Sequence, residues 1–481
     1  MIDATVVGSG PNGLAAAVTL ARAGLSVRVL ERNATIGGGA RSAQLTLPGF
    51  VHDVCSAVHP AALASPFFRA WGLTDRVPFV VPEVSYAHPL DGAPAALAHC
   101  DLARTVEGLG GDGRAWRSLL GPLVARIDAV TDLTGSTLLR VPPHPVAALG
   151  YGLRALEQGT AGWNGRFRAD AAPALLTGVA AHANVPLPSL AGAGAGLLLA
   201  AQGHAAGWGL PLGGSQRIVD ALADDLRAHG GEIVTDAEVR SPADLGPSTV
   251  TLLDTSAEFL DRFGGDRLPA GYRRALRGLR RGAGVAKVDF ALSAPVPWSD
   301  PAVAAAPTVH LGGTRAEIVA SERAVAAGRV APAPYVLVVQ PTLVDPSRAP
   351  EGRHVLWAYL HVPNGSPLDP TEHIVRQLER FAPGFRDTVL AAVARTAPDL
   401  ERDNPNERGG DISGGAATLR QLVRRPVLSS APWRTPIPGL YLCSSATTPG
   451  PAVHGMNGWY AARLALRDRF ALPAPLSALA S

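Results

Sequence analysis

Three glycines near the N-terminus, Gly8, Gly10 and Gly13 of the segment GSGPNG, have the spacing of a turn that binds a dinucleotide pyrophosphate. Because glycines carry no side chain, backbone N–H groups and the positive end of a following helix can approach the phosphates. Glu31 stands 21 residues after Gly10, where a carboxylate can accept hydrogen bonds from ribose hydroxyls. The pattern predicts a dinucleotide site that also contains Ser9, Pro11, Asn12 and Arg32.

A lone glycine turn is often a chance match, so the elements that must position it decide its interpretation. Residues 4–7 are typical of a buried strand, residues 11–23 of a helix closed by Gly24, and residues 26–30 of a second strand. The glycines fall between the first strand and the helix, and Glu31 falls at the end of the second strand. This βαβ order favours the dinucleotide interpretation over a chance turn.

A second glycine-rich segment, IGGGARS at residues 36–42, follows the second strand. It resembles the second glycine motif of FAD enzymes in the phytoene desaturase and flavin amine oxidase superfamily, and for this reason FAD is favoured over NAD. The resemblance implies that Gly38, Gly39, Ala40 and Arg41 approach the cofactor, with Arg41 supplying positive charge near the phosphates. The alternative is a flexible loop.

The C-terminal run PGLYLCSSATTPGPAVHGMNGWYAA, residues 438–462, resembles the C-terminal FAD motif of phytoene desaturases and related carotenoid enzymes. In that family a strand ends beside the ribityl chain, and the next helix points its N-terminus at the flavin pyrimidine edge. The chain departs from the usual motif, with Ser444, Pro451 and Ala452 at frequent glycine positions and His454 at a frequent proline position. The contacting positions are Ser444, Ser445, Val453 and Met456.

A third segment, residues 213–239, resembles the same family, and its closing Val239 takes the place of a valine that contacts the adenine through its backbone. The expected fold is α/β: a discontinuous, doubly wound Rossmann-like FAD-binding domain with an inserted α+β substrate-binding domain of mixed sheet and helices. The FAD-binding domain is predicted over residues 1–60, 203–258 and 405–481. The substrate-binding domain is predicted over residues 61–202 and 259–404.

Lys287, the single lysine beside 42 arginines, lies in the strand-like segment GVAKVDFAL. This segment can be aligned with the one in which flavin amine oxidases place a lysine bonded through water to flavin N5, so the resemblance makes Lys287 a candidate catalytic residue. The alternative is a strand lysine whose ammonium group reaches solvent.

Trp357, Tyr359 and His361 would share one face of a strand by alternation, and that face could line an apolar substrate pocket. His454 is a further, weaker catalytic candidate because its segment approaches the flavin in the family. For all four residues, packing in the protein interior is the alternative explanation.

The net charge of +3 over 481 residues is too small to indicate a nucleic-acid partner. The three cysteines form no CxxC pair, and no metal site is expected. The N-terminus runs directly into a strand without a secretory leader pattern, so a cytoplasmic location is expected. Peripheral membrane association stays open, because five arginines between residues 273 and 281 would cluster if the segment is helical.

These features predict an FAD-dependent oxidoreductase that transfers hydride from an apolar small-molecule substrate to flavin N5. An external electron acceptor, such as oxygen or a quinone, would reoxidise the flavin. Two alternatives stay open: a flavin-dependent isomerase or saturase of a polyene without net redox turnover, and a flavin-stabilised interaction protein without turnover.

Overall fold

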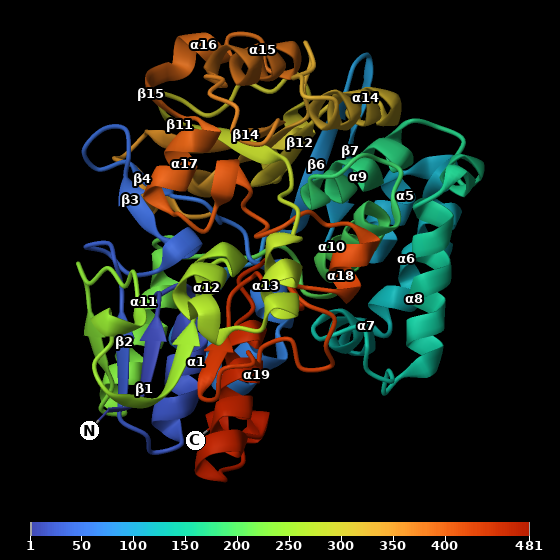
Figure 1. Cartoon of the computed structure of the whole chain (residues 1–481). Coiled ribbons are helices and arrows are strands. Elements are labelled where there is room, and N and C mark those ends of the chain that lie inside the picture. The colour runs from blue at the N-terminus through green and yellow to red at the C-terminus, as the bar shows by residue number, and fades with distance from the viewer. Residues whose placement is uncertain (1, 481) are drawn as a thin grey trace.

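A five-stranded parallel sheet lies near both termini of the chain (Figure 1). The structure is a computed structural model that describes residues 2–480. The strand order is β16-β10-β1-β2-β9, so the first strands along the chain lie in the middle of the sheet. The strands are β1 (Ile2–Val7), β2 (Val27–Leu30), β9 (Glu232–Val234), β10 (Ser248–Leu253) and β16 (Leu440–Leu442).

Helices cover both faces of this sheet. Val6 and Leu252 pack into a cluster with the helices α1 (Pro11–Arg22), α11 (Gln216–Ala228) and α19 (Met456–Ala465). The next residues along the strands, Val7 and Leu253, point to the other face, where α12 (Ala257–Gly264) and α13 (Ala270–Arg277) lie. This alternation explains why the strands are apolar on both sides.

A seven-stranded mixed sheet forms the upper part of the molecule in Figure 1, in the order β15-β11-β14-β13-β12-β6-β7. Its neighbouring strands are antiparallel except β12 and β6. The strands are β6 (Val84–Leu90), β7 (Ala93–His99), β11 (Gly284–Leu292), β12 (Thr308–Leu311), β13 (Val336–Val339), β14 (His354–Val362) and β15 (Val389–Arg395). The helices around it are α14 (Arg315–Ala326), α15 (Thr371–Phe381), α16 (Phe385–Thr388) and α17 (Ala397–Asp403).

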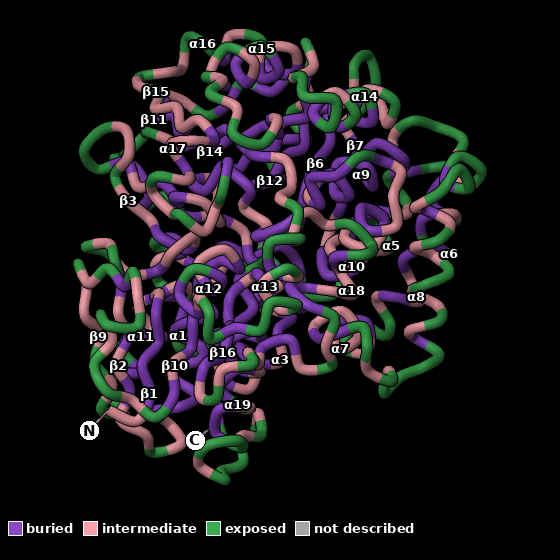
Figure 2. Tube along the Cα trace, viewed as in Figure 1, coloured by how far each residue is buried: buried purple, intermediate pink, exposed green. Residues whose placement is uncertain are grey.

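A group of helices extends from one side of the seven-stranded sheet. They are α5 (Leu102–Gly108), α6 (Gly113–Val124), α7 (Ile127–Thr134), α8 (Pro145–Gln158), α9 (Ala171–Ala180) and α10 (Leu190–Ala205). Figure 2 shows buried chain in α9 and α10 and long exposed stretches in α6 and α8. No helix among residues 2–480 has the length and apolar character that crossing a bilayer requires.

Shorter elements join these layers. They are α2 (Pro60–Ala64), α3 (Pro66–Trp71), α4 (Leu73–Arg76), α18 (Leu419–Val423) and the paired strands β3 (Ser42–Gln44) with β4 (Val51–Asp53) and β5 (Phe79–Val80) with β8 (Leu210–Pro211).

The α/β fold with a Rossmann-like domain and a mixed sheet is the predicted fold class. Within the segment 213–239, the strand β9 is short: it ends at Val234, and Asp236 adopts a left-handed conformation with φ of 53°. The five strands of the parallel sheet fall inside 1–60, 203–258 and 405–481, and the seven strands of the mixed sheet fall inside the other two ranges. Helices α3, α4 and α13 and most of α12 differ, since they pack against the parallel-sheet domain from within the ranges predicted for the substrate-binding domain.

Candidate functional site

A cavity of about 550 Å³ opens at the carboxyl ends of β1, β2 and β10, the edge where open α/β sheets bind ligands. Its volume is in the range of a ligand pocket. Residues from three distant parts of the chain, 7–56, 237–262 and 444–453, converge on the cavity. Residues 404–414 form a fourth part of its wall. The predicted cofactor residues that line it are Gly8, Ser9, Gly10, Pro11, Asn12, Glu31, Arg32, Gly38, Gly39, Ala40, Arg41, Val239, Ser444, Ser445 and Val453.

Gly13, predicted to bind the cofactor, lies behind the cavity wall. Its N–H donates to Asp254 Oδ2 over 3.0 Å, and a Cβ at this position would lie 2.3 Å from the carbonyl oxygen of Gly8. Gly8 itself has φ of 97°, which favours glycine. Positions 8 and 13 therefore admit no side chain, and the turn forms part of the cavity surface as a dinucleotide would require.

Glu31 lines the cavity at the end of β2 and is held in one orientation. Its Oε2 accepts from the Ser9 N–H at 3.0 Å and from Ser9 Oγ at 2.6 Å, and its Oε1 accepts from the Asn33 N–H at 2.9 Å. Oε1, which accepts one hydrogen bond, keeps capacity to accept another. Ser9 Oγ also accepts from the Gly37 N–H at 3.2 Å, so this serine connects the two glycine motifs.

Arg41 lines the cavity, and its charge already has a partner. Its Nη2 pairs with Asp403, and its Nε donates to the Gly38 carbonyl over 2.9 Å. The arginine therefore fixes the second glycine motif against α17. The positive charge predicted near the phosphates is shared with Asp403 in this arrangement.

Four carboxyl groups that the sequence motifs did not single out also line the cavity, Glu238, Asp254, Glu407 and Asp411, and two of them have raised pKa values. Asp254 follows β10, and burial raises its pKa to about 7, with Glu31 adding to the effect. Burial likewise raises the pKa of Glu407 to about 7. A Cβ placed on Gly39 would lie 3.8 Å from Glu407 Oε1 and from Cys55 Cβ, so these groups surround the second glycine motif.

The C-terminal motif contributes backbone and hydroxyl groups. Ser444 Oγ donates to the Thr255 carbonyl over 2.6 Å, and Asn457 Nδ2 donates to the Ser444 carbonyl over 2.9 Å. His454 Nδ1 accepts from the Met456 N–H at 3.0 Å, and burial lowers the pKa of His454 to about 4. The histidine is therefore neutral and accepts from the first N–H of α19, and neither it nor Met456 is among the cavity-lining residues within 2–480.

Lys287 is buried beneath the cavity wall on β11. Its Nζ donates to the carbonyl oxygens of Asp53 and Val54 over 2.5 and 2.8 Å and lies 3.1 Å from Asp289 Oδ1. Burial lowers the pKa of Lys287 and raises that of Asp289. The lysine does not reach solvent, and it holds the chain immediately before Cys55, which does line the cavity.

Trp357, Tyr359 and His361 share one face of β14, as alternation predicted. They are buried in a cluster with Tyr335, and within the described chain none of the three lines the cavity. His361 Nδ1 lies 2.8 Å from Glu322 Oε1. The face forms packed protein behind the Lys287 segment, since Lys287 Nζ lies 5.3 Å from the Trp357 ring.

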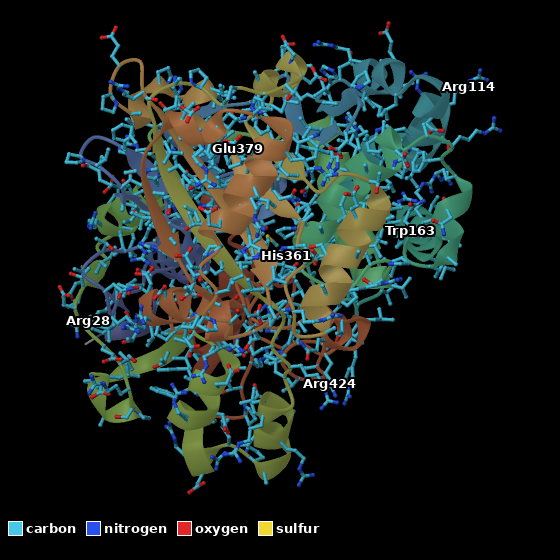
Figure 3. The ribbon with its side chains drawn as sticks, turned by 90° about the horizontal axis from the view of Figure 1, so that it is seen from above. Arg28, Arg114, Trp163, His361, Glu379 and Arg424 are labelled. Atoms are coloured by element: carbon cyan, nitrogen blue, oxygen red, sulfur yellow. The ribbon has the colours of Figure 1, made fainter. Side chains whose placement is uncertain are left out.

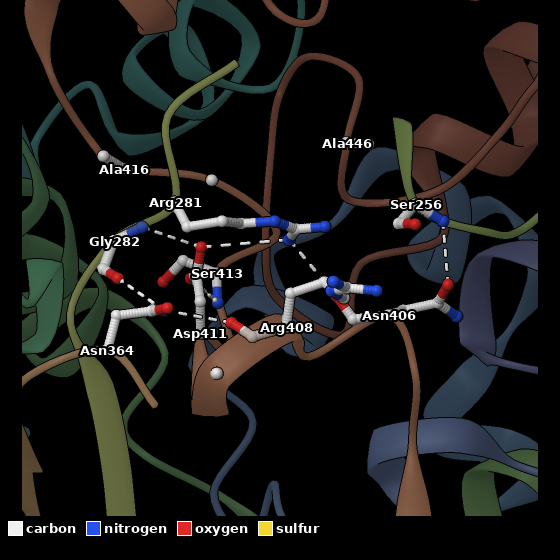
Figure 4. A network of polar contacts seen from close by, with 12 residues as sticks. Ser256, Arg281, Gly282, Asn364, Asn406, Arg408, Asp411, Ser413, Ala416 and Ala446 are labelled. Carbon is white, nitrogen blue, oxygen red and sulfur yellow. Dashed lines mark hydrogen bonds and ion pairs between the residues drawn. The ribbon is translucent and has the colours of Figure 1, made fainter. Parts of the chain in front are cut away.

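A polar network connects residues 404–414 to the Rossmann-like domain beside the cavity (Figure 4). Asn406 Oδ1 accepts from the Ser256 N–H at 2.8 Å, and Asp411 Oδ2 accepts from the Gly282 N–H at 2.9 Å. Arg281 pairs with Glu258 and donates to the Asn406 carbonyl over 3.2 Å. Glycine motifs did not reveal this wall, because its residues act through side chains that contact chain distant in sequence.

Three of the five arginines predicted to cluster in residues 273–281 form ion pairs. Arg273 and Arg277 pair with Asp261 over 2.9 and 2.7 Å, and Arg281 pairs with Glu258. These pairs fix α13 and the following chain to α12. They leave this segment less basic than its sequence indicates.

Comparisons with known proteins agree with this geometry. The model of the NAD(P)-binding Rossmann-like domain matches residues 6–72. A mouse protein, pyridine nucleotide-disulfide oxidoreductase domain-containing protein 2, is 27% identical over 97% of this chain and 93% of its own. The 4,4'-diapolycopen-4-al dehydrogenase of Metabacillus indicus is 31% identical over 25% of each chain.

Among solved structures, a putrescine oxidase double mutant superimposes with a TM-score of 0.63 at 17% identity, covering 98% of this chain and 99% of its own. At this identity the match shows the fold. The fold class is confirmed, and the resemblance that the three sequence motifs indicated is confirmed with it.

Proposed function

We propose that this oxidoreductase of the phytoene desaturase and flavin amine oxidase superfamily binds FAD in the 550 Å³ cavity and oxidises an apolar small molecule. The observation that carries the proposal is the convergence of the first glycine turn, the second glycine motif and the C-terminal motif on one cavity. The fit is supported by the closed backbone of the turn, where a Cβ on Gly13 would collide with Gly8.

Each segment has a distinct part in holding the cofactor. The positive end of α1 and the glycine turn would face the pyrophosphate, and Glu31 would accept from ribose hydroxyls. The second glycine motif, Cys55, Ser444 and Val453 surround the remaining space, which is where the flavin would lie. FAD supplies the hydride acceptor when bound, whereas the protein supplies orientation and exclusion of water.

The substrate is proposed to be apolar, and an external acceptor such as oxygen or a quinone is proposed to complete the turnover. The test is an anaerobic screen of amines, isoprenoids and other apolar compounds against the purified holoprotein, followed by flavin absorbance. Loss of the oxidised flavin spectrum identifies a substrate and supports dehydrogenation. Turnover without an acceptor indicates an isomerase, and a photoreduced flavin that reacts with no acceptor indicates a protein without turnover.

Lys287 is proposed to position the chain before Cys55 through the carbonyls of Asp53 and Val54. Replacing it with methionine leaves Asp289 buried without its cation, so we expect the free energy of unfolding to fall by about 3–5 kcal/mol. Chemical denaturation checks the value, and the double variant Lys287→Met/Asp289→Leu should recover much of the loss. The oxygen reaction of the reduced flavin should change less than about threefold, since the ammonium is engaged with backbone carbonyls. A slowing of tenfold or more, with the fold intact, would instead support the water-holding role that the family resemblance implies.

A further inference from the structure

Helix α8 presents an apolar face to solvent. Val146, Leu149, Leu153 and Leu156 are 70%, 64%, 57% and 53% exposed. Their spacing of three, four and three residues places them on one side of the helix. Together with the preceding chain, seven of the thirteen large apolar side chains exposed among residues 2–480 lie between residues 138 and 156: Leu138, Leu139, Val141, Val146, Leu149, Leu153 and Leu156.

The polar groups of α8 point away from this face. Arg154 Nε donates to the Leu119 carbonyl of α6 over 2.8 Å, and Glu157 pairs with Arg166. Tyr151 donates to the Gly194 carbonyl of α10 over 2.7 Å. The helix is therefore fixed in its orientation, with its polar side chains bound to the protein and its leucines outward, the reverse of an ordinary surface helix.

The chain around this face is basic. Residues 113–168 contain seven arginines and three carboxylates, which are Asp128, Asp132 and Glu157. Arg114 and Arg117 are exposed on α6, which packs against α8, and neither forms an ion pair in the part of the chain that the structure describes. Figure 3 shows Arg114 at the outer margin of the molecule.

We propose that α8 and the chain from Leu138 to Val141 dock on the surface of a membrane that contains anionic lipid. The leucines would enter the boundary between headgroups and acyl chains, and the arginines at the border would meet the headgroup phosphates. The same charges disfavour a second copy of the chain, because pairing two α8 faces would bring two basic borders together. Unlike Arg273, Arg277 and Arg281, which pair with Asp261 and Glu258, Arg114 and Arg117 have no ion-pair partner among the described residues.

The test compares the full-length protein with Leu149→Gln/Leu153→Gln/Leu156→Gln in sedimentation with vesicles. Vesicles of phosphatidylcholine with a quarter phosphatidylserine should bind the parent protein, and the triple variant should bind at least tenfold more weakly. Arg114→Gln/Arg117→Gln should weaken binding to these vesicles and leave any binding to pure phosphatidylcholine unchanged. The matched control is Leu390→Gln/Leu428→Gln, which removes exposed leucines elsewhere and should bind as the parent does.

Light scattering of the same proteins measures their oligomeric state and tests whether a second copy of the chain covers the α8 face instead of a membrane. A parent protein that binds neither vesicle overturns the proposal, and so does a triple variant that binds as the parent does. A dimeric parent that becomes monomeric in the triple variant, without vesicle binding by either, assigns the face to a second copy. All the substitutions lie on exposed positions, so thermal unfolding should stay close to that of the parent protein.

Discussion

Gly13→Ala is expected to weaken FAD binding by about 100-fold, which corresponds to about 2.8 kcal/mol. The added Cβ would lie 2.3 Å from the Gly8 carbonyl oxygen and 3.0 Å from Asp254 Cβ. The carbonyl belongs to the turn itself and cannot move aside as a flexible side chain would. The turn must therefore shift, and the backbone beside the proposed pyrophosphate position shifts with it.

The measurement is the dissociation constant of FAD from the apoprotein, followed by quenching of flavin fluorescence. Gly246→Ala is the matched control, because the same methyl group is added in the same domain at a position where a Cβ meets nothing closer than 3.8 Å. The control should bind FAD as the parent does. Equal affinity of Gly13→Ala and the parent, with circular dichroism unchanged, would remove the pyrophosphate from this turn.

The glycine-rich parts of the site could be predicted from sequence because backbone geometry restricts them to few residue types. Gly8, Gly10 and Gly13 have a fixed spacing, and the flanking apolar runs locate β1 and α1. The lengths of the helices and strands could not be predicted equally well. The strand beginning at Glu232 ends after three residues, where Asp236 adopts a left-handed conformation that no local pattern indicated.

Side chains that act across the fold could not be predicted in the same way. Lys287 was assigned to a strand, and it is in one, but no spacing shows that β11 lies over the carbonyls of Asp53 and Val54. Asp254 and Glu407 line the cavity because β10 and the chain after α17 meet there. Their function depends on tertiary packing, which a pattern of residue types along the chain does not encode.

The sequence pattern of α8 likewise does not show which side of the helix is buried. Apolar residues at helical spacing normally predict a buried face, and the pattern of Val146, Leu149, Leu153 and Leu156 is of this kind. In the structure, the small and polar residues of α8 face α10 and α6, while the leucines face outward. Periodicity identifies the helix, and only the tertiary contacts decide which side is covered.

The second large effect expected is a pH dependence of FAD affinity that originates in Asp254. Its Oδ2 accepts from the Gly13 N–H at 3.0 Å, and a Cβ on Gly10 would lie 2.5 Å from the same oxygen. The carboxyl therefore lies against the turn where we propose the pyrophosphate binds. The titratable neighbours are Glu31 at the end of β2 and Cys443 after β16, and within residues 2–480 no ion pair neutralises Asp254.

The raised pKa of Asp254, about 7, determines whether FAD affinity rises or falls with pH. Below that pH the folded protein holds Asp254 protonated, and above it the group is a carboxylate that would lie beside the anionic diphosphate of bound FAD. For the apoprotein, stability that is fully present below the ordinary carboxyl pKa is lost as the pH rises through 7, because the folded state binds the proton more tightly than the unfolded state. FAD binding should lose affinity in the same direction, by up to tenfold per pH unit above 7.

Asp254→Asn keeps the shape of the side chain and removes its charge, so the dissociation constant of FAD should become nearly constant between pH 6 and 8.5 while the parent weakens at least tenfold. Glu407 also has a pKa of about 7 in the same cavity, and it lies beside Gly39 instead of the pyrophosphate turn. The matched variant Glu407→Gln should therefore retain the pH dependence of the parent. If Glu407→Gln abolishes the dependence and Asp254→Asn preserves it, the proton belongs to the flavin end of the cavity. A parent with constant affinity across this range would mean that Asp254 stays protonated or that the diphosphate lies out of its reach.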